Sequence, residues 1–295
     1  MTLMRDSNPR RVLERHGLHP RRSLGQNFMV HPKTPARIVS EAEVSSAHTV
    51  LEVGAGVGTL TVPLAEDAGR VLAVETDPYL IPVLEEELAG YTNVEIVHGD
   101  ILELDPANLL NASPCGNAPS LWGSRLDNYL VVANLPYYIT SAVIQHLLEA
   151  AVRPTRMVFT VQYEVAKRMI AASGKMSVLS VAMHFYGKPS ILFKLTRGAF
   201  YPMPNVDSAV VRLDVCEHPP IDVADVALFF DIVRAGFAQR RKQLRNTLAS
   251  TLHLDPHQVE RAFEGVQISH KRRAESLSMV EWEQVYKALQ PLLSC

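Results

Sequence analysis

The chain has 295 residues, 47% of them hydrophobic and 20% charged, and its 29 basic and 31 acidic residues give a net charge of -2. This composition excludes a disordered, collagen-like or disulfide-scaffold protein, and the length predicts one large domain with an appendage or two unequal domains. Apolar runs all fall short of the roughly 18 residues of a membrane span, and the amino terminus lacks a signal-peptide pattern. We therefore expect a cytoplasmic protein without membrane attachment.

Charge is distributed unevenly along the chain. Residues 75–105 carry nine carboxylates and no Lys or Arg, residues 1–37 carry eight Lys or Arg against two acids, and residues 234–245 carry five against none. Such segregation suggests a face that binds polyanions, although solvated charged faces give the same pattern. The three cysteines lie far apart and the histidines lack the spacing of metal ligands, so we expect neither a disulfide framework nor a metal site.

Short β-branched runs alternate with helix-like stretches from residue 49 to about residue 161, which is typical of a parallel sheet covered by helices. The expected strands are residues 49–53, 70–75, 93–97, 129–134 and 156–161. The expected helices are residues 59–67, 78–89, 140–150 and 163–172. This order predicts an α/β fold with a doubly wound, Rossmann-like sheet. Residues 106–128, which are rich in Pro, Asn, Ser and Gly, predict a long surface loop.

After residue 172 the sequence predicts first further strands and then a group of helices. VLSVAMHFYG, ILFKLTRGAF and DSAVVRLDV predict further strands, and because they are too closely spaced for helical crossovers we expect antiparallel pairs. After residue 220 the strand pattern stops, and helical spacing of apolar residues appears in 224–238, 240–252, 256–263 and 279–290. We therefore expect a larger α/β domain over residues 1–217 and a small all-helical domain over residues 218–295.

A glycine-rich turn follows the first predicted strand of the sheet. Gly54, Gly56 and Gly58 lie between that strand and a helix, and Glu75 ends the next strand, where a ribose would be held in a nucleoside-binding fold. Thr59 stands where the dinucleotide fingerprint G-x-G-x-x-G needs its third glycine, which disfavours a dehydrogenase. The spacing resembles the S-adenosylmethionine turn of doubly wound methyltransferases, and a plain tight turn is the alternative.

Two further groups follow strands at the same edge of the predicted sheet. Asp100 could accept a hydrogen bond from the adenine of a cofactor, or could cap a helix. Asn134, Leu135, Pro136 and Tyr137 resemble the (Asn/Asp)-Pro-Pro-(Tyr/Phe) signature of amino-group methyltransferases. The Asn134 amide oxygen and the Leu135 carbonyl could accept both hydrogens of an adenine amine, and Tyr137 could stack on an extruded base. An ordinary strand-to-helix loop is the alternative.

With these residues in place, the chain resembles the ribosomal RNA adenine dimethyltransferase family from about residue 22 to residue 282. LGQNF, the glycine turn, NLPY, VQYEVAKR, GKMSVLSV, FYPMPNVDSAVVRL, GFAQRRKQLRNTL and RRAESLS occur in the family's order. The resemblance implies S-adenosylmethionine as cofactor and dimethylation of two adjacent adenosines in small-subunit ribosomal RNA. It also implies cofactor contacts from Asn27 and Met29, alongside Gly54, Glu75, Asp100 and Asn134. Related enzymes methylate large-subunit RNA, but the GFAQRRK and RRAESLS segments favour the small-subunit branch.

The resemblance also implies contacts with RNA and a cellular context. Phe200 could pack against the target adenine or be a buried hinge aromatic. A basic helix would face phosphates through Arg240, Arg241, Lys242 and Arg245. The implied partner is RNA within a pre-ribosomal small-subunit particle, bound by a monomer that contributes to ribosome maturation. Tyr138 stands where the family often has Asn, and residues 106–128 form a longer segment than usual.

Two other functional classes compete with this interpretation. A binding or assembly factor could keep the fold without turnover, but the intact Asn134–Tyr137 segment argues against a loss of chemistry. A dehydrogenase would be distinguished by which cofactor protects the protein against thermal unfolding.

Overall fold

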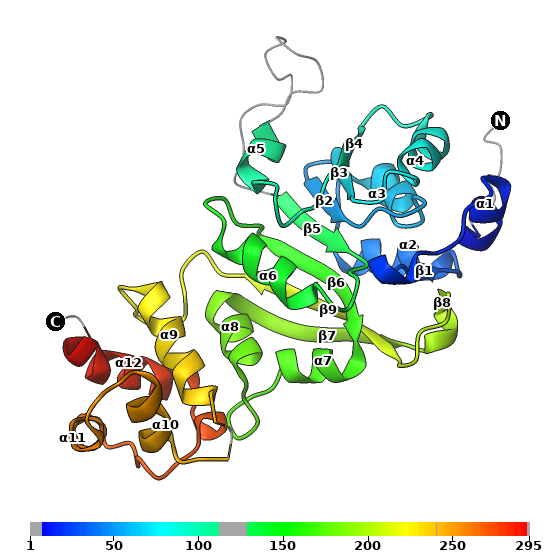
Figure 1. Cartoon of the computed structure of the whole chain (residues 1–295). Helices are drawn as coiled ribbons and strands as arrows, with labels where there is room; N and C mark the ends of the chain where they lie inside the picture. Colours follow the sequence, from blue (N-terminus) through cyan, green and yellow to red (C-terminus); the bar gives the residue numbers. More distant parts are fainter. Residues whose placement is uncertain (1–7, 112–128, 240, 294–295) are drawn as a thin grey trace. The chain divides into compact units, whose positions relative to one another are not determined.

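The computed structural model describes residues 8–111, 129–239 and 241–293 (Figure 1). Its main sheet has seven strands in the order β4-β3-β2-β5-β6-β9-β7. The strands are β2 (Thr49–Val53), β3 (Arg70–Glu75), β4 (Val94–His98), β5 (Tyr129–Ala133), β6 (Arg156–Gln162), β7 (Gly187–Leu195) and β9 (Ser208–Val215). Strands β2 to β6 pair in parallel and β9 pairs antiparallel with β6, which confirms the predicted doubly wound sheet and its antiparallel addition.

The strand order reverses between β2 and β5. From β2 the chain proceeds outward through β3 and β4, and it then returns to the other side of β2 to add β5 and β6. Such a reversal opens a crevice at the carboxyl ends of the strands, which is where doubly wound sheets bind ligands. The central strands are buried on both faces, as expected for parallel strands covered by helices.

The predicted helices of this region are present as α3 (Thr61–Asp67), α4 (Ile81–Leu88), α6 (Thr140–Glu149) and α7 (Tyr163–Met169). Other elements were not predicted. They are α1 (Pro9–Arg15), α2 (Lys33–Glu41), α5 (Pro106–Asn111) and a two-stranded sheet of β1 (Phe28–Met29) with β8 (Phe200–Tyr201). The helix α5 occupies the start of the predicted 106–128 loop, and residues 112–128 lie outside the described residues. Within the described chain, no helix combines the length and apolar character needed to cross a bilayer.

The strand prediction for VLSVAMHFYG is wrong, because this segment forms α8 (Val178–Tyr186). A capping box starts the helix: Ser177 accepts from the Ser180 backbone, and the Ser180 hydroxyl accepts from the Ser177 backbone N–H. Phe185 and Tyr186 at its end pack with Phe229 and Phe230 in an aromatic cluster. An apolar run without clear periodicity fits a buried helix as well as a buried strand. The pattern alone therefore could not distinguish the two structures.

The chain forms two compact units. The first comprises Met1–Ala166 and Ser190–Val215, and the second comprises Lys167–Pro189 and Cys216–Cys295. The second unit contains α8, α9 (Val226–Phe237), α10 (Leu244–Thr251), α11 (Pro256–Gly265) and α12 (Met279–Leu293). Residues 167–189, which lie within the predicted domain 1–217, group in the structure with the helical unit. The segment's strand-like composition concealed that α8 belongs to a helical core.

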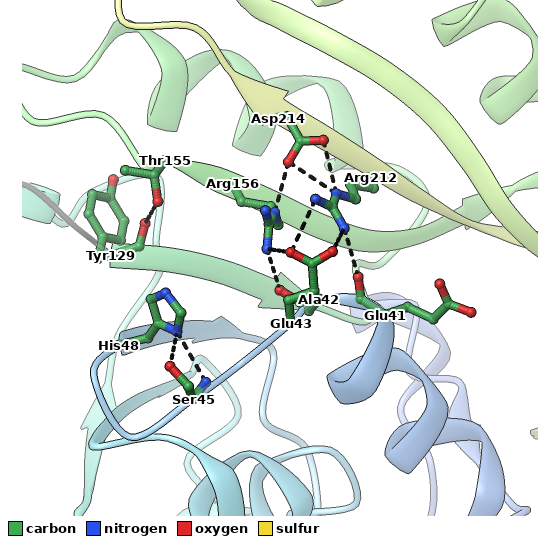
Figure 2. Close-up of polar contacts among 10 residues, drawn as sticks. All are labelled: Glu41, Ala42, Glu43, Ser45, His48, Tyr129, Thr155, Arg156, Arg212 and Asp214. Carbon is green, nitrogen blue, oxygen red and sulfur yellow. Dashed lines mark hydrogen bonds and ion pairs between the residues drawn. The ribbon is translucent and has the colours of Figure 1, made fainter.

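A polar cluster at the start of β6 anchors α2 within the first unit (Figure 2). Arg156 and Arg212 each form an ion pair with both Glu43 and Asp214, at N–O distances of 2.7 to 2.9 Å. The same two guanidinium groups donate to the carbonyls of Ala42 and Glu41 at the end of α2. These contacts satisfy carbonyl groups that a helix end leaves without intrahelical partners.

Candidate active site

A cavity of about 200 Å³ lies at the carboxyl ends of β2, β3, β4 and β5, within the first unit. It is lined by residues of four strand ends and of the segment before β1. They are Leu24, Gly25, Gln26, Asn27, Phe28, Val53, Gly54, Gly56, Val74, Glu75, Thr76, Gly99, Asp100, Ile101, Asn134, Leu135, Pro136, Tyr137, Tyr138 and Ile139. The structure thus brings the predicted glycine turn, both carboxylates and the Asn134–Tyr137 segment to one place.

The glycine turn provides space on one wall of the cavity. Gly54 and Gly56 adopt φ angles of 77° and 63°, in the left-handed region that favours glycine. A Cβ atom on Gly56 would lie 2.9 Å from the Phe28 ring, so the turn and the segment around Phe28 can approach this closely only with glycine there. Gly58 does not line the cavity. Its φ angle of 82° also lies in the left-handed region that favours glycine, and a Cβ there would be at an ordinary contact distance of 3.6 Å from Leu84 of α4.

Glu75 is held rigidly at the end of β3. Its Oε2 accepts from the Gly56 N–H and its Oε1 from the Asp77 N–H, both at 2.8 Å. The residue is 5% exposed, and this burial raises the pKa of Glu75, while the backbone hydrogen bonds act in the opposite direction. Each carboxylate oxygen retains a further lone pair for a ligand. A carboxylate fixed in this way suits the paired hydroxyls of a ribose.

Asp100 lies at the cavity and caps a turn, where the sequence analysis offered a cofactor contact or a helix cap as alternatives. It lines the cavity, and its Oδ1 accepts from the backbone N–H of Leu102 at 3.0 Å in the turn that follows β4. Capping of this turn fixes the direction of the side chain. A second carboxylate oxygen therefore remains available at the cavity, on the same side of the sheet as Glu75.

The orientation of the Asn134 amide follows from one contact. Its Nδ2 donates to the Asn27 carbonyl at 2.7 Å. A carbonyl oxygen can only accept, so this contact requires the amide nitrogen on the Asn27 side and directs Oδ1 elsewhere. Because Asn134 lines the cavity, Oδ1 is the amide atom that can accept a hydrogen bond from a ligand there.

The rest of the Asn134–Tyr137 segment is equally constrained. Leu135 is buried, and the Pro136 carbonyl accepts from the Thr140 hydroxyl at 3.2 Å at the start of α6. The Tyr137 hydroxyl forms a 2.6 Å hydrogen bond with the hydroxyl of Ser208, the first residue of β9. Burial raises the pKa of Tyr137, and the Ser208 contact acts in the opposite direction. The phenol is thus tethered at its far end while the residue lines the cavity.

Three predicted site residues do not line the cavity. Met29 is 2% exposed and Phe200 is 4% exposed, and both belong to the hydrophobic core, where they pair across β1 and β8. Neither side chain lines the cavity, so the structure favours the buried-aromatic alternative for Phe200. Gly58 is not among the cavity-lining residues, and its positive φ angle is the feature that favours glycine there. Strand pairing with β8, which the sequence did not reveal, explains the burial of Met29.

The predicted basic helix face is only partly observed. Arg241 and Lys242 are exposed in the turn between α9 and α10, before the helix begins at Leu244. Arg245 lies on α10 and forms a 3.2 Å ion pair with Glu260 of α11. Arg240 lies outside the described residues. The helix prediction was wrong for 241 and 242, because the apolar spacing of α10 extends only over residues 244–251.

Sequence reasoning missed two groups beside the cavity. Gln26 lines it, and its amide donates to Asp77, which follows Glu75 by two positions. The sequence analysis noted Gln26 only within a motif and Asp77 only within an acidic stretch. Elsewhere in the described chain, His16, Glu86 and Glu87 come close enough to share a cation, but Arg15 already contacts Glu87.

A model of the family described as "Ribosomal RNA adenine dimethylase" matches residues 17–290, which include every cavity-lining residue. The chain belongs to the ribosomal RNA adenine dimethylase family. Its members are S-adenosylmethionine-dependent methyltransferases, so this dimethylase is an enzyme of that class.

Similar proteins cover nearly the whole dimethylase. Ribosomal RNA small subunit methyltransferase A of Moorella thermoacetica is 42% identical over 95% of this chain and 96% of the relative. The protein of the same name from Dehalococcoides mccartyi is 40% identical over 93% and 90%. The crystal structure of the 23S rRNA methyltransferase ErmE superposes with a TM-score of 0.67 at 27% identity, covering 89% of this chain and 99% of ErmE. A Plasmodium falciparum dimethyladenosine transferase, 22% identical, shares the fold with a TM-score of 0.71 over 90% of this chain and 98% of its own.

Proposed function

We propose that this dimethylase places two methyl groups on the exocyclic amine of each of two adjacent adenosines in small-subunit ribosomal RNA. The two relatives described above, both named for the small subunit, are 40% and 42% identical to it, whereas the 23S rRNA methyltransferase ErmE is 27% identical. Its substrate is RNA within a pre-ribosomal small-subunit particle, and methylation contributes to ribosome maturation. The enzyme acts as a cytoplasmic monomer.

The orientation of the Asn134 amide is the observation that carries this proposal. An exocyclic adenine amine is a poor nucleophile because its lone pair is delocalised into the ring. Asn134 Oδ1 and the Leu135 carbonyl accept hydrogen bonds from the two amine hydrogens, which favours a pyramidal nitrogen and stabilises positive charge developing on it. The hydrogen bond to Asn27 holds the amide ready for this role before the substrate arrives.

Tyr137 completes the substrate side. Its ring stacks on the extruded adenine, and because its hydroxyl is bound to Ser208, the ring does not have to be ordered on binding. Tyr138 lines the cavity and is an exposed aromatic residue, so it offers a second surface where the family often has Asn.

The cavity residues fit S-adenosylmethionine, which supplies the methyl group when bound. Glu75 accepts from both ribose hydroxyls, and Asp100 accepts from the adenine amine of the cofactor. Glycine at positions 54 and 56, favoured by their positive φ angles, leaves this part of the cavity lining without side chains. Asn27 contributes from the opposite wall. Met29 supports this wall from the core and does not contact the cofactor through its side chain.

The helical unit contributes the RNA-binding surface. Arg241 and Lys242 are exposed in a turn, where they can reach phosphates. Arg240 belongs to the same basic segment in the sequence. Arg245 is the weaker candidate for a phosphate contact, because it is already paired with Glu260.

Methylation of small-subunit particles that lack these methyl groups tests the proposal. The parent protein should transfer methyl groups from labelled S-adenosylmethionine, and mass spectrometry of digested RNA should find dimethyladenosine at two adjacent positions. Asn134→Ala should lower single-turnover methylation on the order of a hundredfold, by analogy with removing one oxyanion-hole donor, while particle binding changes little. Methylation of large-subunit RNA instead would contradict the substrate. An Asn134→Ala variant as fast as the parent would remove Asn134 from the mechanism, and a parent that binds the particles without transferring methyl groups would favour a binding factor.

A further inference from the structure

A short segment before β1 closes one wall of the cavity. We call residues 21–28 the strap; it includes a 3-10 turn at Arg22–Leu24 and ends in β1. Its residues 24–28 line the cavity without interruption. The wall facing the cofactor and the substrate amine is therefore built from a segment that lies outside the main sheet.

Asp77 attaches the strap to the loop after β3. Its Oδ1 accepts from Arg21 Nη1 at 3.0 Å, and its Oδ2 accepts from Gln26 Nε2 at 2.7 Å. Gln26 Oε1 accepts in turn from the Arg21 backbone N–H at 2.8 Å, which closes a ring of three residues. Asp77 is 1% exposed. Asp77 Oδ1 also accepts from the Tyr79 backbone N–H at 3.2 Å, so release of the strap would leave the buried charge with this one backbone donor and without its Arg21 counter-ion.

The same aspartate also orients the ribose-binding carboxylate. Its backbone N–H donates to Glu75 Oε1 at 2.8 Å. At the other end of the strap, the Asn27 carbonyl accepts from the Asn134 amide. The strap therefore connects the carboxylate on the cofactor side to the amide on the substrate side.

Close packing leaves the strap little freedom while these contacts persist. A Cβ atom on Gly25 would lie 3.1 Å from the Tyr138 ring and 3.2 Å from Pro136 Cβ. Gly25 also adopts a φ angle of 62°. A partial displacement of the strap would break these contacts together, which favours two states, closed and released, over a gradual movement.

We propose that Asp77 is a positioning residue that holds the strap closed, through Arg21 and Gln26, so that cofactor affinity and the orientation of Asn134 depend on one buried carboxylate. The inference rests on the proposed function, because it assigns the cavity to S-adenosylmethionine. When only a fraction of molecules has the strap closed, the apparent dissociation constant rises by the inverse of that fraction. Release of Asn27 also frees the Asn134 amide to rotate away from the substrate.

The test compares Asp77→Asn, Arg21→Ala and the matched control Arg22→Ala in the full chain. Asparagine at position 77 keeps the backbone N–H to Glu75 but lacks the charge paired with Arg21, and it cannot accept from Arg21 and Gln26 through two oxygens. Arg21 is about half exposed, so its removal leaves the fold intact if Asp77→Asn fails to fold. Arg22 is exposed in the same turn and provides the control. Binding of S-adenosylhomocysteine is measured by calorimetry, and hydrogen exchange is followed in the strap amides.

Asp77→Asn and Arg21→Ala should each weaken S-adenosylhomocysteine binding about tenfold and accelerate exchange in the strap, and Arg22→Ala should do neither. In the parent, bound S-adenosylhomocysteine should slow hydrogen exchange of the strap amides. If both variants bind within twofold of the parent while Glu75→Ala binds much more weakly, the inference is wrong and the proposed cofactor site stands. Weaker binding with unchanged strap exchange would also overturn it, because the effect would then act through Glu75 alone. A parent that does not bind S-adenosylhomocysteine would instead overturn the proposed function.

Discussion

Glu75 has a buried carboxylate whose two oxygens are already directed by backbone N–H groups. Glu75→Ala should remove the acceptors for both ribose hydroxyls, at about 1.5 to 3 kcal/mol for each charge-assisted bond lost. Affinity for S-adenosylmethionine should fall at least tenfold by calorimetry. Glu85→Ala, an exposed change in the same acidic stretch, provides the control. An unchanged dissociation constant for Glu75→Ala would remove this residue from the site.

A second buried carboxyl, Glu52 of β2, makes stability depend on pH. Burial, with repulsion from Glu75, raises the pKa of Glu52 from an ordinary 4.5 to about 8, although the Thr61 hydroxyl opposes the shift. Between these two values the folded protein binds a proton that the unfolded chain does not, so stability falls as pH rises through this window. The loss is at most about 1.4 kcal/mol per pH unit, and it stops above the folded-state pKa.

Glu52→Gln keeps the shape of the neutral acid at every pH. It should therefore raise the free energy of unfolding relative to the parent more at pH 8 than at pH 5. Urea unfolding at the two pH values measures this difference. An equal effect at both would show that Glu52 has the same protonation in the folded and the unfolded protein over this range.

The site residues that could be predicted share one property, which is their place at strand ends. Glu75, Asp100 and Asn134 each follow a strand with a clear β-branched pattern, so the sheet topology alone brings them together. The contact between Gln26 and Asp77 joins residues 51 positions apart, and no local pattern reveals such pairs. The burial of Phe200 depends on pairing with β1, a strand of two residues that is too short to predict.

At the scale of elements, the central strands β2, β3 and β5 were predictable because they are buried on both faces and therefore consist mainly of apolar residues, with Val the most frequent. The helix α8 was not, because its apolar residues surround it and leave no periodic polar face. Ser177 and Ser180 of its capping box were the available signal for a helix start, but a Ser-x-x-Ser spacing is weaker than one with Glu or Gln.

The polar cluster that anchors α2 offers a test at this scale (Figure 2). Arg212→Met keeps the aliphatic packing but removes the ion pairs with Glu43 and Asp214 and the bond to the Glu41 carbonyl. Because the guanidinium is largely buried and Glu43 is exposed, we expect a loss of about 1 to 3 kcal/mol in the free energy of unfolding. The matched change Arg234→Met, which breaks an exposed pair with Asp231, should cost less than about 0.5 kcal/mol. Urea unfolding compares the two, and equal costs would contradict the anchoring role.

At the scale of the whole molecule, the structure shows that some of the unevenly distributed charges pair with one another. The basic amino-terminal segment pairs with the acidic stretch 75–105: Arg15 contacts Glu87 and lies 3.9 Å from Glu86, and Arg21 binds Asp77. Arg10 pairs with Glu14 of its own helix. Part of the charge that is segregated along the sequence is thus neutralised within the first unit. The polyanion-binding face that the charge pattern suggested is therefore better sought in the turn after α9.

Two single neutralisations test this interpretation, because each removes one exposed positive charge. Lys242 lies in the turn after α9, and Arg10 is paired with Glu14. Each phosphate contact contributes about 0.7 to 0.9 to the slope of log affinity against log salt, so Lys242→Gln should reduce the slope for small-subunit RNA by roughly this amount. Arg10→Gln should reduce it by less than half as much, because the paired guanidinium releases fewer counterions on binding. Affinity for S-adenosylhomocysteine should be unchanged in both variants. Equal slopes in the two variants would mean that the amino-terminal helix binds RNA as strongly as the turn, and that its ion pairs open to do so.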